Sequence, residues 1–116
     1  MSSVLEYKGY VGSIEFSVDD EIFYGKVQGI RSLISYEGVD AKELIKDFKD
    51  AIDDYLDSCK GRGIEPEKAY KGTFNIRISP ELHKVAAIYA YEHKTSLNAV
   101  VENALKGFVY NAKAVN

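Results

Sequence analysis

The sequence of 116 residues contains no tryptophan, two prolines and a single cysteine. Because Cys59 has no second cysteine to pair with, no internal disulfide is available, and a reducing cytoplasm fits the chain. No stretch approaches the roughly 18 apolar residues that a membrane helix needs. The N-terminus also lacks the basic segment followed by an apolar one that is typical of a secretory signal. We therefore expect a cytoplasmic protein that does not enter a membrane.

Residue patterns for catalysis or metal binding are also missing. His83 and His93 lie on one predicted helix, about 15 Å apart along its axis, so they cannot share a metal. The sequence has no phosphate-binding glycine loop, no nucleophile elbow and no H-E-x-x-H pattern. A small buried apolar residue is the usual role of a lone cysteine such as Cys59. We expect no enzymatic activity, no cofactor and no metal site.

Charge is distributed unevenly along the chain. Residues 1–70 contain nine basic and fifteen acidic residues, a net charge of −6. Residues 71–116 contain six basic and three acidic residues, a net charge of +3. An acidic first part and a basic second part suggest two surfaces with different partners. Chance unevenness explains the charges alone equally well.

The first 60 residues are typical of strands followed by one long helix. Alternating apolar residues in 7–17, 22–27 and 33–36 predict a three-stranded meander. Asp40 is a suitable N-cap for a helix that should end near Gly61. The apolar residues of this helix recur at three- and four-residue steps: Leu44, Ile45, Phe48, Ala51, Ile52, Tyr55, Leu56 and Cys59.

Residues 61–71 are rich in glycine and charge and predict a linker. After it, residues 72–78 alternate strictly between apolar and polar side chains, as a strand does. Ser79-Pro80 then predicts a helix start, and Thr95-Ser96 a second one. The helical periodicity stops at Phe108, so we expect a flexible tail over residues 110–116.

One strand and two short helices cannot bury enough apolar surface to be stable alone. A two-fold dimer would pair the strands antiparallel and close four helices over them. We expect its core to contain Phe74, Ile76, Ile78, Leu82, Leu97, Val101 and Leu105.

The other face of such a β-ribbon would show Thr73, Asn75 and Arg77 twice. An isolated polar-alternating strand usually only presents such residues to solvent. Here the required dimer and the positive charge favour insertion into the DNA major groove, where arginine can recognise guanine and asparagine adenine. Backbone N–H groups at Ser96, Leu97 and Asn98 suit a phosphate, and Lys71 adds a charge next to the strand. We expect operator DNA with an inverted repeat as a partner.

Residues 73–108 resemble the Arc/MetJ-type ribbon-helix-helix family. The F-N-I-R-I alternation leading into S-P-E-L, and the segment T-S-L-N-A-V-V, carry this resemblance. Upstream, YEGVDAKELIKDFKDAIDDYLDSCKGRGIEPEKAYKG is similar to the N-terminal domain and linker of HicB antitoxins.

The resemblance implies an α+β protein with a partial RNase H-like ββ(β)α domain over residues 1–60. A linker over 61–71, a ribbon-helix-helix domain over 72–109 and the tail would follow. HicB proteins pair with HicA toxins, which are small ribonucleases that cleave mRNA, and repress their shared operon. The resemblance thus implies a HicA-like toxin as a partner, and a homodimer, with a tetramer left open.

An acidic stripe on the long helix comprises Asp47, Asp50, Asp54 and Asp57. A solvated face is the usual meaning of such a stripe, and shielding a basic toxin is the alternative. Two further functions stay open: a stand-alone repressor of the same architecture, and a divergent nuclease. The spread of the four carboxylates along the helix argues against the nuclease, because two-metal hydrolysis needs carboxylates that converge.

Overall fold

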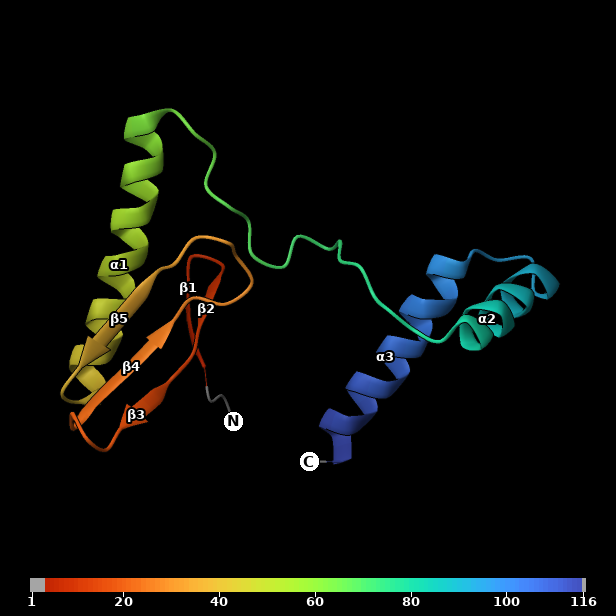
Figure 1. The fold of residues 1–116 in the computed structure, drawn as a ribbon, viewed down its shortest axis with the longest axis horizontal. Coiled ribbons are helices and arrows are strands. Elements are labelled where there is room, and N and C mark those ends of the chain that lie inside the picture. The colour runs from red at the N-terminus through yellow and green to blue at the C-terminus, as the bar shows by residue number, and fades with distance from the viewer. Residues whose placement is uncertain (1–3, 116) are drawn as a thin grey trace. The chain divides into compact units, whose positions relative to one another are not determined.

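The structure is a computed structural model that describes residues 4–115, with side chains through residue 111. It is an α+β fold, as the sequence predicts. The chain divides into two units, residues 1–73 and 74–116. Within the described residues the elements are β1 (Leu5–Tyr7), β2 (Tyr10–Gly12), β3 (Glu15–Ser17), β4 (Ile22–Lys26), β5 (Ser35–Gly38), α1 (Ala41–Arg62), α2 (Pro80–Glu92) and α3 (Leu97–Val115), labelled in Figure 1.

The first unit has five strands in two antiparallel sheets, where the sequence predicts one three-stranded meander. Strands β1 and β2 form a hairpin, and β3, β4 and β5 form a second sheet in that order. The predicted first strand is wrong, because Lys8 and Gly9, both with positive φ, turn the chain back inside it. The chain then passes between the sheets at Ser13, whose backbone N–H donates to the carbonyl of Lys26 at 3.1 Å.

The long helix α1 confirms the predicted helix and its N-cap. The Asp40 carboxylate accepts a hydrogen bond from the backbone N–H of Glu43 at 2.8 Å, which satisfies one free donor of the first turn. At the other end, Gly63 caps the helix in the left-handed conformation, with φ of 67°. The Ile64 N–H donates to the carbonyl of Cys59 at 3.0 Å, so the chain reverses directly after the helix.

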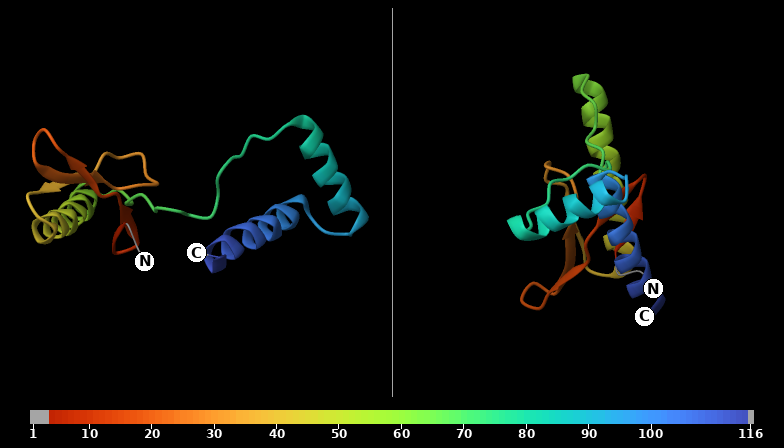
Figure 2. Two further views of the ribbon diagram at one scale, coloured as in Figure 1. Left: turned by 90° about the horizontal axis from the view of Figure 1, so that it is seen from below. Right: turned by 90° about the vertical axis from the view of Figure 1, so that its right-hand side faces the viewer.

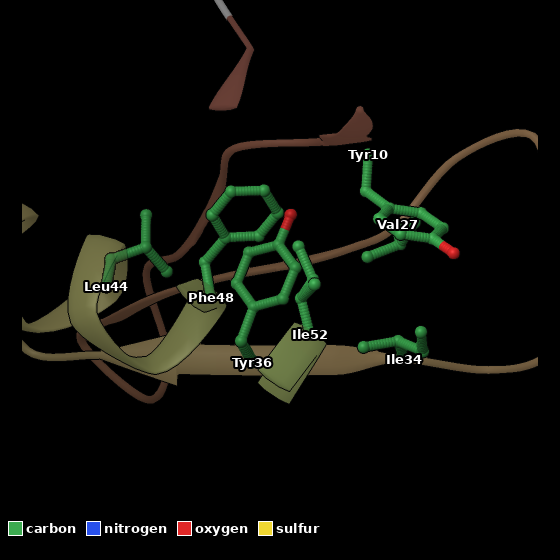
Figure 3. Close-up of a cluster of buried hydrophobic side chains, with 7 residues drawn as sticks. All are labelled: Tyr10, Val27, Ile34, Tyr36, Leu44, Phe48 and Ile52. Carbon is green, nitrogen blue, oxygen red and sulfur yellow. The ribbon is translucent and has the colours of Figure 1, made fainter. Parts of the chain in front are cut away.

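A cluster of buried side chains joins α1 to both sheets. It contains Tyr10, Val27, Ile34, Tyr36, Leu44, Phe48 and Ile52 (Figure 3). Helix α1 lies along one face of the three-stranded sheet and packs mainly against β5, as the left view of Figure 2 shows. Tyr36 packs its ring against Phe48, with ring centroids 5.0 Å apart, and its hydroxyl donates to the carbonyl of Ser13 at 2.7 Å. This tyrosine therefore ties the sheet to both the helix and the chain crossing between the sheets.

Close packing around Tyr36 explains two glycines. A Cβ atom at Gly12 would overlap the Tyr36 hydroxyl, and one at Gly25 would overlap the backbone carbonyl of Ser13. Neither position has room for a side chain, because the two sheets approach each other there.

The second unit consists of α2 and α3, and its helix starts are as predicted. The Ser79 hydroxyl accepts from the N–H of Leu82 at 3.1 Å, and the Ser96 hydroxyl accepts from the N–H of Ala99 at 3.0 Å. Helix α3 continues through residues 110–115, where the sequence predicts an irregular tail; residue 116 lies outside the described residues. Among residues 4–115, no segment pairs with the predicted strand over 72–78.

Ile52→Ala should lower the free energy of unfolding by about 2–5 kcal/mol, because Ile52 is fully buried and its loss leaves a cavity. The matched control is Ile45→Ala on the same helix, since Ile45 is 39% exposed and should cost much less. Urea denaturation followed by circular dichroism measures both. Equal losses for the two variants would contradict this description of the core.

Candidate functional site

The polar residues predicted to contact DNA bases are exposed in the structure. Thr73, Asn75 and Arg77 have exposed side chains. Within the described part of the chain, residues 72–78 make no hydrogen bond or ion pair. These side chains and their backbone are therefore free to bind a partner, while the chain alone does not hold them in a strand.

The apolar residues of the predicted dimer core are largely uncovered. Phe74 is 70% exposed and Leu82 is 53% exposed. Ile76, Ile78 and Leu105 are exposed as well, while Leu97 and Val101 are half-buried. Among the residues described in the second unit, only Ala90 is buried. Five of the seven residues are thus exposed and two are half-buried in the single chain.

The start of α3 has the electrostatics of an anion-binding helix end. The Ser96 hydroxyl caps one N–H of the first turn, and Leu97 and Asn98 lie at the positions where other N–H groups have no helical acceptor. The first turn contains no acidic residue that would repel a phosphate. Lys71 is exposed and makes no ion pair in the described structure.

The structure separates the four aspartates of the acidic stripe on α1 into two groups. Asp47 accepts a hydrogen bond from the backbone N–H of Glu37 at 2.9 Å, so it closes the outer edge of β5. Asp50 forms an ion pair with Lys46 at 2.8 Å. Asp54 and Asp57 are exposed and have no hydrogen bond or ion pair in the described residues. The free part of the stripe is therefore its C-terminal half.

A further charged cluster lies beside the β1–β2 hairpin, and the sequence did not predict it. Asp53 forms an ion pair with Lys8 at 2.8 Å and accepts from the hydroxyl of Tyr7 at 3.1 Å. The Lys8 ammonium is the main reason that the pKa of Asp53 lies below its usual value. The partners are far apart in sequence, so no local pattern indicates the pair.

No three His, Cys, Asp or Glu side chains in the described residues gather closely enough to hold a metal ion. Within residues 4–115, no helix has the length and apolar character that crossing a membrane requires.

Comparison with known protein families gives a match over the middle of the chain. Residues 55–105 match the model of the HicB family, which covers the end of α1, all of α2 and the first half of α3. Residues 55–105 are thus similar to HicB-family proteins, while residues 1–54 lie outside the match. No curated protein and no solved structure matches the chain.

Asp47→Ala should lower the free energy of unfolding by about 1 kcal/mol, because the Glu37 N–H loses a charged acceptor at a half-exposed position. Asp54→Ala removes the same group from the same helix where it has no partner, and should stay within about 0.5 kcal/mol of the wild type. Chemical denaturation distinguishes the two. A loss at Asp54 as large as that at Asp47 would contradict the division of the acidic stripe.

Proposed function

We propose that this chain is a HicB-type antitoxin that neutralises an mRNA-cleaving toxin of the HicA kind and represses its own operon. The observation that carries the proposal is the family match across residues 55–105, because it spans parts of both units. The first unit would be the partial RNase H-like, toxin-binding domain. The second would be a ribbon-helix-helix domain, and neither would have enzymatic activity.

Dimerisation through the second unit is supported by its uncovered apolar residues. A unit of about 40 residues, with one buried side chain among residues 74–111, is below the size at which a single core sustains a fold. Two copies related by a two-fold axis would bury Phe74, Ile76 and Ile78 against the helices and pair residues 73–78 as an antiparallel ribbon. Such pairing would also supply the hydrogen bonds that this backbone lacks within one chain.

DNA binding is supported by the residues that this pairing leaves on the outer face. A two-stranded ribbon fits the major groove, and Arg77 and Asn75 have the side chains that recognise guanine and adenine there. Thr73 would contact a third position. The uncapped N–H groups at Leu97 and Asn98, together with Lys71, would hold the phosphates on either side.

Toxin binding is supported by the charge of the first unit. A basic, RNA-binding toxin complements residues 1–70, which have a net charge of −6. Asp54 and Asp57 are the members of the stripe with free carboxylates, so they are the first candidates for toxin contact. Asp47 and Asp50 would contribute to the local field while keeping their internal partners.

The DNA-binding proposal predicts that Arg77→Ala and Asn75→Ala each cost about 1–3 kcal/mol per contacted base pair and relax the sequence preference there. Lys71→Ala should instead weaken all sequences about equally and flatten the salt dependence. Gel-shift titrations on the protein's own promoter at two salt concentrations measure these effects, with circular dichroism as the control for folding. If Arg77→Ala and Asn75→Ala both leave affinity and preference unchanged, the ribbon does not recognise the operator.

The toxin-binding proposal predicts that a fragment ending at Thr73 loses repression and still neutralises the toxin encoded beside it. This fragment retains all elements that pack in the first unit. Growth rescue in cells that express the toxin, and co-purification with it, are the measurements. A well-folded fragment that neither rescues growth nor binds the toxin would refute the antitoxin function. It would leave the DNA-binding proposal unaffected.

A further inference from the structure

The segment that follows α1 is held on the first unit by Glu67. Its carboxylate accepts hydrogen bonds from the backbone N–H of Arg31 at 2.7 Å and of Ser32 at 2.9 Å, and from the Ser32 hydroxyl. Its own N–H donates to the Tyr55 hydroxyl at 2.8 Å, and its carbonyl accepts from the hydroxyl of Tyr10. Every polar group of Glu67 is thus bonded to residues that are distant in sequence.

After Glu67, Ala69 and Tyr70 also contact the first unit. Ala69 packs against the core cluster, and the Tyr70 ring lies over Gly29, where a Cβ atom would come within 3.0 Å of it. Tyr70 and Gly72 then adopt positive φ angles of 53° and 92°. After Tyr70, residues 71–78 make no hydrogen bond in the described structure. The attached chain therefore ends at Tyr70.

The bonds to the carboxylate are of the strong kind. Hydrogen bonds that involve a charged group are about twice as strong as neutral ones. The Ser32 hydroxyl and the N–H groups of Ser32 and Arg31 stabilise the charged form, which lowers the pKa of Glu67 below its usual value. The ionised Glu67 carboxylate therefore holds the segment on the loop of Arg31 and Ser32.

We propose that residues 64–70 are a latch, closed by Glu67 on the loop at Arg31 and Ser32, that sets the reach between the two units. With the latch closed, the free chain runs from residue 71 to the helix cap at Ser79, about nine residues that span at most about 30 Å. With the latch open, the free chain starts after Gly63, and about sixteen residues span at most about 55 Å.

The consequence for regulation rests on the proposed function. If residues 73–78 form the ribbon on DNA, the closed latch leaves only about two free residues between the ribbon and the toxin-binding unit. A toxin bound to the first unit would then be held close to the operator. Opening the latch would lengthen the free chain and let the bound toxin move farther from the operator. The latch would couple the two activities through the length of the tether.

Limited trypsin digestion of the full chain tests whether the latch exists. In the wild type, cleavage should be fast after Lys71 and slow after Lys68 and Arg31. Glu67→Ala should speed cleavage at both slow sites by about tenfold, because three hydrogen bonds between them are lost. The matched control is Glu65→Ala, since Glu65 is exposed and has no partner in the described structure. It should leave both sites slow.

Small-angle scattering of the same two variants tests the reach. The radius of gyration should be larger for Glu67→Ala than for Glu65→Ala. Neither measurement needs toxin or operator, so failure of the latch and failure of the antitoxin function are distinguishable. Unchanged cleavage at Lys68 and Arg31 in Glu67→Ala would overturn the latch. Faster cleavage with an unchanged radius of gyration would overturn its effect on reach.

Cleavage after Lys49, in the middle of α1, reports general unfolding of the first unit. If Glu67→Ala also exposes Lys49, Ser32→Ala decides the question, because it removes one hydroxyl donor and leaves the carboxylate in place. Faster cleavage at Lys68 and Arg31 with Lys49 still protected then supports the latch. Cleavage of Ser32→Ala that is unchanged from the wild type overturns it.

Discussion

Most apolar side chains of residues 74–111 are exposed in the single chain, and the possible roles of the second unit depend on this constraint. Burial of apolar surface is the main favourable term in folding, and here it is nearly absent: only Ala90 is buried. A helix pair of this kind is stable only when another surface completes it. The proposed DNA binding follows from the same requirement for burial. The dimer that would cover Phe74, Ile76 and Ile78 would also place their polar neighbours on one face.

Local chemistry made the helices predictable. Asp40, Ser79 and Ser96 each accept a hydrogen bond from an N–H in the first turn of the helix that follows, and this requires only neighbours in sequence. The end of α3 was harder to predict. Its apolar periodicity stops at Phe108, yet no proline or helix-ending glycine follows, so nothing in the backbone chemistry interrupts the helix through residues 110–115.

Contacts between distant residues were not predictable from one sequence. Composition indicated a linker over residues 61–71, but Glu67 bonds to residues 12 to 57 positions away and joins the first unit. Asp47 likewise belonged to a stripe by spacing, while its role at the edge of β5 depends on a strand that precedes it. For the candidate site, the sequence indicated which residues are exposed. Only the structure shows which of these residues already have a hydrogen-bond or ion-pair partner within the chain.

The two units satisfy their polar backbone in different ways, and this difference locates the functional surface. In the first unit, the segment after α1 finds donors and acceptors in its own chain at Tyr10, Tyr55 and the loop of Ser32. Residues 72–78 find none in the described structure. Alternating side chains and unpaired N–H and C=O groups are what a strand offers to another strand. The last backbone hydrogen bonds of the attached segment are those of Glu67, and its packing contacts end at Tyr70. The part of the chain that requires a partner begins directly after these residues.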